Sequence, residues 1–449
     1  MASKRKLKLG AFLWPDGHHP AAWRHRSARN QGRPDFGLYA QMARTAERGK
    51  FDAIFLADGV AVRARDVDMA SRGIQGIGFE PLTLLSALAA VTEHVGLIAT
   101  ASTTFNEPFN VARKFASLDH LSGGRAAWNV VTSSSDAEAQ NFNGEKILAH
   151  ELRYERASEF LDVVTGLWDS WDDETFDSPD KQSGVYFDPA RLHVLNHRGK
   201  YLSVRGPLNV PRPPQGYPVI VQAGSSEAGR ELAARTAEMI YAPAQSLAAA
   251  QAFYTDVKGR MAKYGRAPEH LIITPGVFPV VGNSAQEARD KYEQLQELMD
   301  PKVGVSYLAN FLGGADLSAY PVDGPLPELP DTNAGKGRFK QLTELARREN
   351  LTIRELYLRF AVVRGHRLVL GTAEQIADQL EDWFVHDGAD GYNVVPPYMP
   401  SGLEDFVDLV VPELQRRGLF RTEYEGGTLR ENLGLPRPAN RYKSMSASA

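Results

Sequence analysis

The stretch from Val219 to Arg235 joins an apolar run to a helix start and could hold an anion. The run Val219–Gln222 stops at Gly224-Ser225-Ser226, and an alanine-rich helical pattern begins at once. Serine is favoured at helix starts because its hydroxyl accepts a hydrogen bond from a free backbone N–H. The same free N–H groups and the positive end of the helix dipole also attract anions. The stretch therefore has two interpretations, a helix cap and a phosphate site.

Polar side chains follow four other apolar runs of the chain. His18 and His19 come after the first run, and Asp58 lies in a possible Asp-Gly turn after the second. Two further runs end in the hydroxyl-rich segments Thr103-Thr104 and Ser133–Ser135. Each group has an ordinary explanation as a loop or turn residue. Together they would place hydroxyl, carboxylate and imidazole groups around one site if the runs are neighbouring strands.

Composition and spacing exclude several classes of function. The formal net charge is only -4, which suggests neither nucleic acid nor an anionic membrane as a partner. The chain contains no cysteine, which excludes disulfides and thiolate chemistry. No H-E-x-x-H motif occurs and His18-His19 lack zinc-binding spacing, so we predict no metal site. The serine run lacks a G-x-S-x-G elbow, which argues against a serine hydrolase. Without a membrane span or signal peptide, we expect a cytoplasmic protein.

The elements that must position these groups alternate between short apolar runs and amphipathic segments, as in repeated βα units. One helix is expected after the cap candidate Asp35, with Gly49 as its stop, and a long one from about Gly144 to Trp171. We predict eight strands: Lys6–Phe12, Asp52–Leu56, Val95–Ala101, Ala126–Val131, Val219–Gln222, Met239–Tyr241, Leu271–Val281 and Tyr392–Val395.

Eight such units predict an α/β fold of the (β/α)₈ TIM-barrel type. A doubly wound sheet is the alternative, but the chain lacks the G-x-G-x-x-G loop that it would need after a strand. We expect one barrel domain over residues 1–430 and a C-terminal extension over 431–449. The 449 residues exceed a minimal barrel. Long insertions at about 172–217 and 301–370 would hold much of the excess, and the second is our candidate lid.

Several segments, taken in order, resemble the bacterial-luciferase superfamily from about Leu7 to Leu414. Within it, they are similar to the nitrilotriacetate monooxygenase component A group, which includes dibenzothiophene-sulfone, EDTA and long-chain alkane monooxygenases. The combination is specific, although each segment alone is not. The segments are "GHHPAAWRH", "YAQMARTAERGKFDAIFLADG", "GLIATASTTFNEPFNVARKFASLDHLSGGRAAWNVVTS", "LRYERASEFLDVVTGLW" and "VQAGSSEAGRELAAR".

The resemblance implies a barrel that binds reduced FMN, supplied by a separate NAD(P)H:flavin reductase. O₂ would add to the reduced flavin, and the flavin peroxide would insert one oxygen atom into a small organic substrate. By the same resemblance, Asp58 and Thr104 would hold the polar edge of the isoalloxazine ring, and Asn129 would lie near that ring. Members of the group are often dimers or tetramers, and the sequence does not decide between them.

The resemblance also assigns the opposite end of the flavin. His150 and Tyr154, four residues apart on one helical face, would contact the ribityl-phosphate side. Ser225 and Ser226 would bind the phosphate. Barrels more often bind phosphate after strands seven and eight, whereas this family uses strand five. The cap and phosphate interpretations then become compatible.

Flavin peroxide chemistry requires the exclusion of water more than acid–base catalysis. His18 and His19 are candidates for proton donation or substrate orientation, and Ser135 for a hydrogen bond on the oxygen side. Four apolar side chains near the predicted mouth would shape the substrate site, with plain barrel core as the alternative: Phe12, Trp14, Phe55 and Phe79.

Two alternative functions and the substrate stay open. A deazaflavin-dependent oxidoreductase could use the same barrel without oxygen, and a flavin-binding barrel without catalysis could serve as a sensing partner. An aromatic sulfur or halogenated compound would suit the aromatic mouth. An aminopolycarboxylate would require cationic groups there, and the early loops offer Arg24, Arg63, Arg65 and Arg72.

Overall fold

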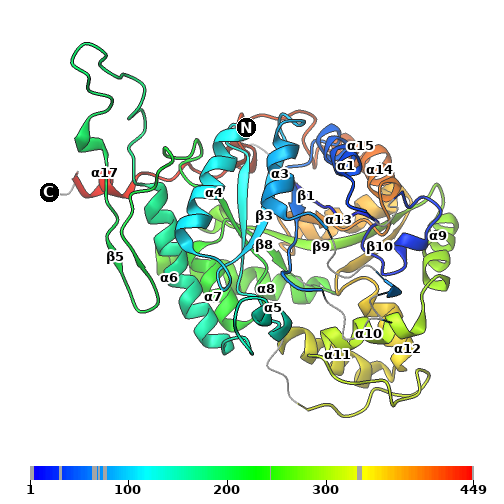
Figure 1. Ribbon diagram of the computed structural model, residues 1–449. Coiled ribbons are helices and arrows are strands. Elements are labelled where there is room, and N and C mark those ends of the chain that lie inside the picture. The colour runs from blue at the N-terminus through cyan, green and yellow to red at the C-terminus, as the bar shows by residue number, and fades with distance from the viewer. Residues whose placement is uncertain are drawn as a thin grey trace.

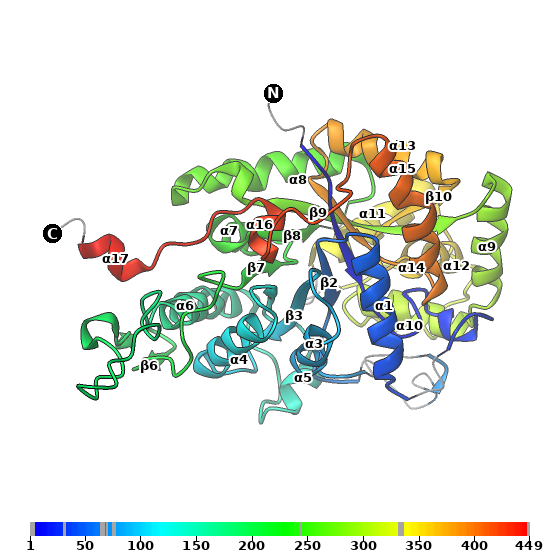
Figure 2. The same cartoon turned by 90° about the horizontal axis from the view of Figure 1, so that it is seen from above.

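Short runs of apolar residues, buried on both faces, form a closed parallel barrel in the computed structural model (Figures 1 and 2). The structure describes residues 5–29, 33–62, 68, 71–73, 78–242, 244–330 and 336–446. Eight strands follow one another around the ring, and the pairing of β8 with β9 closes it. They are β1 (Lys8–Phe12), β2 (Ala53–Leu56), β3 (Gly96–Ser102), β4 (Ala126–Val131), β7 (Val219–Gln222), β8 (Met239–Ala242), β9 (Ile272–Val281) and β11 (Gly391–Val394). The predicted (β/α)₈ barrel is confirmed.

A ninth strand, β10 (Arg367–Gly371), was not predicted. It pairs in parallel with the outer half of β9, from Arg367 opposite Val277 to Gly371 opposite Val281. The last residues of the expected 301–370 insertion therefore belong to the sheet. Only three apolar residues stand between Arg367 and Gly371, and this run is too short to stand out as a strand.

Helices surround the barrel and begin where the sequence offers caps. The Asp35 carboxylate accepts a hydrogen bond of 2.8 Å from the Gly37 N–H at the start of α1, and Gly49 ends that helix. The long helix α6 begins at His150, later than Gly144, which puts His150 in its first turn. The covering helices are α1 (Phe36–Arg48), α3 (Pro81–Ala89), α4 (Pro108–Leu121), α6 (His150–Trp168), α7 (Glu227–Thr236), α8 (Leu247–Arg260), α9 (Ala285–Glu297) and α13 (Ala373–Val385).

The two long insertions differ in form. Residues 172–217 project from the body as an arm that carries β5 (His197–Arg198) and β6 (Ser203–Val204) (Figure 1). The described residues 301–330 and 336–366 instead carry helices beside the barrel. These are α10 (Pro301–Phe311), α11 (Lys336–Glu349) and α12 (Ile353–Leu356), followed by a π-helical turn at Tyr357–Ala361. Further short helices are α5 (Asp136–Gln140), α14 (Ser401–Asp405), α15 (Val411–Arg416), α16 (Leu429–Leu433) and α17 (Arg441–Ser446).

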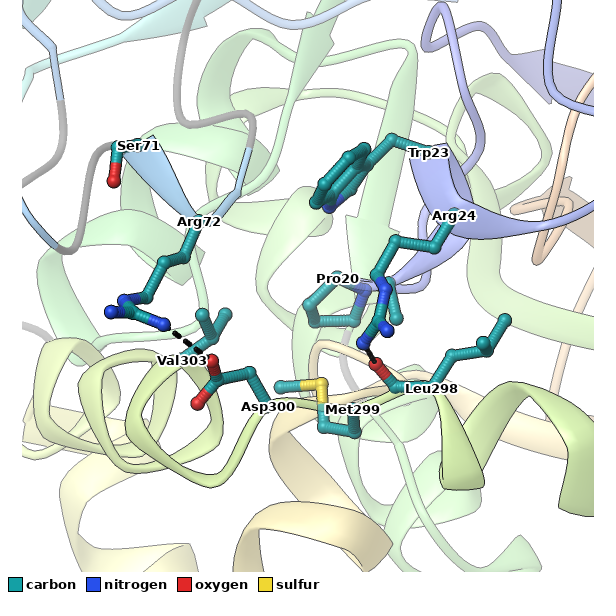
Figure 3. Close-up of a pocket in the computed structure, with 10 residues that line it drawn as sticks. Pro20, Trp23, Arg24, Ser71, Arg72, Leu298, Met299, Asp300 and Val303 are labelled. Carbon is teal, nitrogen blue, oxygen red and sulfur yellow. Dashed lines mark hydrogen bonds and ion pairs between the residues drawn. The ribbon is translucent and has the colours of Figure 1, made fainter.

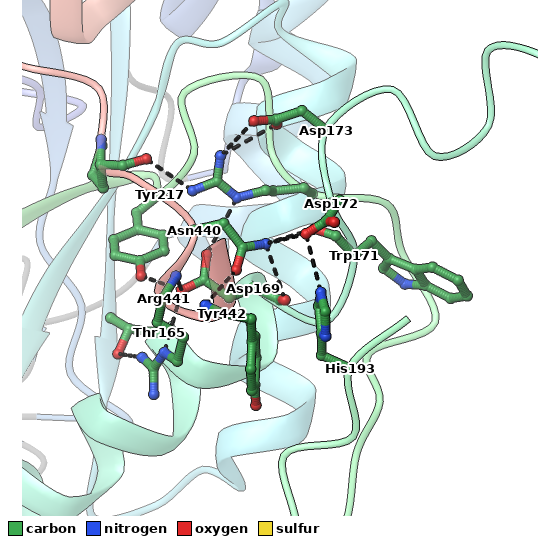
Figure 4. A network of polar contacts seen from close by, with 12 residues as sticks. Thr165, Asp169, Trp171, Asp172, Asp173, His193, Tyr217, Asn440, Arg441 and Tyr442 are labelled. Carbon is green, nitrogen blue, oxygen red and sulfur yellow. Dashed lines mark hydrogen bonds and ion pairs between the residues drawn. The ribbon is translucent and has the colours of Figure 1, made fainter. Parts of the chain in front are cut away.

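The C-terminal residues, which we expected to extend beyond the core, pack against it. Leu433 and Leu435 are buried, and so is Asn440. Arg441 and Arg212 both donate to the carboxylate of the fully buried Asp169, at 3.2 Å each (Figure 4). The tail thereby joins the end of α6 to the base of the projecting arm.

The N-terminal ends of the strands are closed by buried ion pairs. Asp52, just before β2, pairs with Arg421 and accepts the Leu9 N–H at 2.8 Å. Glu238, just before β8, pairs with Arg430, whose Nη2 lies 2.9 Å from its carboxylate. Charge pairs at this end of a barrel serve stability, whereas function belongs at the opposite end.

Within the described ranges, no helix is both long and apolar enough to cross a membrane. The same residues contain no group of three or more potential metal ligands among His, Cys, Asp and Glu.

Candidate active site at the barrel mouth

The loop from β7 into α7 forms one side of the mouth. Ser226 is the N-cap of α7, and its Oγ accepts a hydrogen bond of 3.2 Å from the Gly229 N–H. This confirms the helix-cap interpretation of the Gly-Ser-Ser stretch. Arg230 Nε donates to the Ser225 carbonyl at 2.9 Å and fixes the preceding residue. The positive end of the α7 dipole therefore points to a loop of defined geometry.

Two glycines let a tyrosine hydroxyl approach this helix start. A Cβ atom added at Gly224 would stand 3.1 Å from Gly229 Cα and 3.1 Å from the Tyr154 hydroxyl. A Cβ added at Gly229 would meet the same hydroxyl at 3.1 Å. The His150 ring lies 4.8 Å from that of Tyr154, centroid to centroid. The structure thus brings Tyr154 and His150 to the Gly224–Ser226 loop, from α6 to the start of α7.

Strands β3 and β4 end in a linked set of hydroxyl groups. Thr104 Oγ1 donates to the Thr132 carbonyl at 2.8 Å, and its backbone N–H donates to Ser102 Oγ at 3.1 Å. Ser102 Oγ lies 2.9 Å from Ser133 Oγ, and Ser133 adopts a left-handed φ of 54°. Because its proton is committed to Thr132, the Thr104 hydroxyl offers its lone pairs to the mouth.

Asn129 holds a buried polar atom without a partner among the described residues. Its Nδ2 donates to Thr100 Oγ1 at 2.9 Å, and Thr100 Oγ1 donates to the Leu56 carbonyl at 2.9 Å. The side chain is 2% exposed, yet its Oδ1 has no hydrogen-bond partner among the described residues. Buried polar atoms are nearly always paired, and an unpaired one calls for an explanation such as a missing ligand.

Three aromatic rings form an apolar floor for the mouth. Phe12 and Phe55 are 4.6 Å apart, and Phe55 lies 4.6 Å from Tyr241, centroid to centroid. The Tyr241 hydroxyl is buried without a hydrogen-bond partner among the described residues, and burial raises its pKa. Such a floor suits a flat aromatic ligand and keeps water away from it.

His18 stands against this floor as a neutral imidazole. Its ring lies 4.2 Å from Phe12, its Nε2 donates to the Phe12 carbonyl at 2.9 Å, and its Nδ1 accepts from Arg364 at 3.2 Å. Burial, together with the charge of Arg364, lowers its pKa well below the usual value. At neutral pH, His18 therefore has no spare proton beyond the one bound to Phe12.

The other candidates from the sequence lie in three different places. His19 packs away from the floor, where its Nδ1 accepts the Ala21 N–H and burial lowers its pKa to about 3. Ser135 starts α5, where its backbone N–H donates to Glu138. The Asp58 carboxylate accepts a hydrogen bond of 2.8 Å from the N–H of its neighbour Gly59, in a turn. These contacts give each of the three a structural role, and their roles toward a ligand stay predictions.

Of the four apolar candidates, three gather and one does not. The Trp14 ring lies 6.2 Å from the His18 ring, centroid to centroid, and His18 in turn packs on Phe12, which packs on Phe55. Phe79 is 39% exposed and packs on Tyr39 of α1 instead, 6.0 Å away.

Arg364 is the main mouth residue that sequence reasoning missed. Its guanidinium lies 5.4 Å from the Trp14 ring and 6.0 Å from the Phe12 ring. Its left-handed φ of 55° is unusual for a residue other than glycine, asparagine or aspartate. Arg364 lies just before β10, so missing that strand hid the residue. Strained residues gather at functional sites.

A cavity of about 300 Å³ lies among segments at the mouth end of the barrel (Figure 3). The loop after β1 forms one wall, Ser71 and Arg72 a second, and the segment that leads into α10 a third. Arg24 and Arg72, two of the four arginines singled out in the sequence, line it. Arg63 and Arg65 lie outside the described residues.

The chain matches the family model described as luciferase-like monooxygenase over residues 17–391. It is 54% identical to N-acetyl-S-(2-succino)cysteine monooxygenase of Bacillus subtilis (strain 168), over 98% of this chain and 100% of the relative. It is 51% identical to nitrilotriacetate monooxygenase component A of Aminobacter aminovorans, over 98% and 99%.

Among solved structures, it is similar to a riboflavin lyase crystallised with modified FMN and riboflavin. The TM-score is 0.87 and the identity 31%, over 96% of this chain and 97% of that one. The resemblance seen in the sequence is confirmed, and the relatives named here share both the fold and the full length of the chain. The chain is therefore an oxygenase enzyme that belongs to the luciferase-like monooxygenase family.

Proposed function

We propose that this chain is the oxygenase component of a two-component system, which uses reduced FMN and O₂ to oxygenate a small organic substrate. The observation that carries the proposal is the cradle at the start of α7. There Gly224 and Gly229 leave space beside the Tyr154 hydroxyl, at the positive end of a helix. That arrangement suits a dianionic phosphate on a ligand that also needs an aromatic floor.

The donors and acceptors of the mouth fit FMN along its length. Ser225, Ser226 and Tyr154 would hold the phosphate, and His150 would lie along the ribityl chain. At the other end, Asn129 Oδ1 lacks a partner among the described residues and could accept from a ring N–H. The Thr104 hydroxyl offers a second acceptor, and Asp58 would complete this edge. A flavin requires this combination of anion site, apolar slot and polar edge.

Bound reduced FMN supplies the two electrons with which O₂ gives one oxygen atom to the substrate and the other to water. The chain's own residues position and protect this chemistry. Phe12, Phe55 and Tyr241 exclude water from one wall of the site. His18 Nδ1 accepts a hydrogen bond from Arg364 and holds it in place, so that the Arg364 guanidinium brings a positive charge to the floor. Ser135 and His19 would act only if their loops move from the positions described.

A second protein must deliver the reduced flavin. The name of the Aminobacter relative, component A, implies a partner component in that system. The sequence here lacks the glycine-rich fingerprint of a dinucleotide site. We therefore propose an NAD(P)H:flavin reductase as the partner, acting through diffusible reduced FMN.

The test compares FMN with riboflavin in binding titrations of the double variant Ser225→Ala/Ser226→Ala. Hydrogen bonds to a charged group contribute about 1.5–3 kcal/mol, so each lost contact should weaken FMN about tenfold or more. Riboflavin, which has no phosphate, should bind nearly as before. Thr428→Ala is the control, since Thr428 caps α16 with an equivalent hydroxyl contact at the N-terminal end of the barrel, opposite the mouth. Equal losses for both ligands would contradict the phosphate assignment.

The reaction itself is tested with an added flavin reductase. Substrate-dependent O₂ uptake with FMN, and none with a deazaflavin, is the expected outcome. Hydride transfer to a deazaflavin without O₂ uptake would replace this proposal by the oxidoreductase alternative.

A further inference from the structure

The cavity of Figure 3 lies among segments that follow β1, β2 and β9, at the mouth end of the barrel. Ala21, Met299 and Val303 line it, and they belong to the same packed cluster as Phe12 and Phe55. Its volume of about 300 Å³ lies at the lower end of the range for small-molecule sites.

The two arginines of this cavity differ in how their charge is used. Arg72 donates to Asp300 at 3.1 Å across the cavity wall and to Asp68 at 3.0 and 3.2 Å. Its charge is therefore already compensated, and its role is to join two walls. Lys302 adds a longer contact to Asp68, at 3.9 Å.

Arg24 has no such compensation. Its Nη1 donates to the backbone carbonyl of Leu298, as Figure 3 shows, and no carboxylate forms an ion pair with it among the described residues. A guanidinium has five N–H donors in a planar fork that matches a carboxylate. The cavity consequently carries one uncompensated positive charge at its Arg24 side.

The remaining lining is apolar and polarisable. Trp23 is 43% exposed, although large aromatic side chains are normally covered, and it stands over the cavity beside Pro20 and Met299 (Figure 3). This combination of an indole, a thioether and one cation suits a ligand with a carboxylate joined to an apolar or sulfur-bearing portion.

We propose that this cavity is the substrate-recognition subsite, in which Arg24 binds a carboxylate of the substrate and thereby selects carboxylated substrates over neutral heterocycles. The inference rests on the proposed function, because the bound carboxylate would orient the rest of the molecule toward the barrel mouth. A neutral aromatic sulfone would leave the Arg24 fork without a counter-ion and would lose this contact. Arg24 is then a specificity-determining residue.

The experiment measures binding by calorimetry, with oxidised FMN present and absent, so that no turnover is needed. The probes are N-acetyl-S-(2-succino)cysteine, its fully esterified neutral form, and dibenzothiophene sulfone. The wild-type protein should bind the acid at least tenfold more tightly than the ester, and the difference should shrink at high salt. Equal affinity for acid and ester, or no binding of the acid in either state, would overturn the proposal.

Arg24→Met keeps the apolar stem and removes the charge. It should weaken the acid about tenfold or more and leave the ester unchanged, while Arg24→Lys should restore part of the loss. Arg26→Met is the matched control, since Arg26 is an exposed arginine on the same loop that does not line the cavity. If Arg26→Met reduces binding as much as Arg24→Met, the effect is general electrostatics and the proposed subsite is wrong.

The two proposals fail separately. If FMN binds and substrate-dependent O₂ uptake occurs only with neutral substrates, the carboxylate subsite is wrong and the monooxygenase proposal stands. If the acid binds through Arg24 but no reduced flavin supports O₂ uptake, the proposed function is wrong and the subsite stands.

Discussion

The two ends of the barrel differ in how their buried polar groups are paired. At the N-terminal end, buried charges have partners. Asp52 pairs with Arg421, and Arg125 donates all five of its N–H groups to the Thr92 hydroxyl and to backbone carbonyls. At the mouth, two neutral buried groups, Asn129 Oδ1 and the Tyr241 hydroxyl, lack partners among the described residues. The carboxylates are paired at one end, and we propose that a ligand completes the other.

The largest effect on stability should follow from breaking an ion pair at the N-terminal end of the barrel. Asp52→Asn leaves Arg421 buried beside a neutral group, and removal of one partner of a buried pair costs about 3–5 kcal/mol. Urea unfolding should show this loss, while the FMN affinity of the folded protein stays unchanged. The double variant Asp52→Asn/Arg421→Met should recover part of the stability. A change in FMN affinity larger than the change in stability would show that the two ends are not separate.

The neutral histidines beside the mouth predict the next largest effect, through pH. Burial lowers the pKa of His19 to about 3, whereas in the unfolded chain it titrates near its ordinary value. Below that ordinary value the unfolded chain binds a proton on His19 and the folded chain does not. The contribution of His19 to the free energy of unfolding is therefore complete above about pH 6.5 and is lost progressively in acid. Between pH 7 and pH 5, His19 alone should cost about 2 kcal/mol of unfolding free energy.

His19→Gln should flatten this part of the pH dependence. His386→Gln provides the control, because His386 is exposed on the outer helices. An unchanged pH slope in His19→Gln would show that His19 is charged or accessible in the folded protein.

A smaller effect on binding, with little effect on stability, is expected from Gly224→Ala. The added methyl group would press on Gly229 Cα and the Tyr154 hydroxyl, each 3.1 Å away. FMN should bind about tenfold more weakly, which corresponds to about 1.4 kcal/mol. Gly259→Ala, in α8 with open space around it, should leave FMN binding as it was. A loss of stability without a loss of affinity would assign Gly224 to the fold alone.

The smallest effect distinguishes two buried tyrosines. Tyr241→Phe removes a hydroxyl without a partner among the described residues, so the flavin-free protein should keep its stability or gain slightly. Tyr392→Phe removes a hydroxyl that donates to the Leu380 carbonyl at 2.6 Å and should cost about 0.5–1.5 kcal/mol. Equal losses in thermal unfolding would mean that Tyr241 is satisfied in a way that the described contacts do not include.

The sequence predicted the eight-stranded ring because its strands are continuous apolar runs, and runs such as Gly96–Ser102 are buried throughout. It failed at β10, where Arg367 and Leu368 are only half-buried and the apolar run is short. Local signals were sufficient for Ser226, since a helix cap depends on its immediate neighbours. The resemblance, and not the pattern of residues, pointed to Asn129.

Contacts between distant segments could not be predicted. Arg364 and His18 form a hydrogen bond although they lie far apart in the sequence, and no local pattern predicts that contact. Phe79 was expected near the predicted mouth, but its ring packs on Tyr39 of α1. The cavity likewise depends on how the loop after β1 meets the segment before α10.

The arginines that neutralise the buried carboxylates have a consequence for synthesis of the protein. Asp52 and Glu238 are made well before their partners Arg421 and Arg430. During translation, which proceeds from the N-terminus, the strands beside these carboxylates leave the ribosome before the two arginines exist. The two ion pairs can therefore form only after the segment that carries Arg421 and Arg430 has been released, and we expect the nascent chain to keep these carboxylates in water until then.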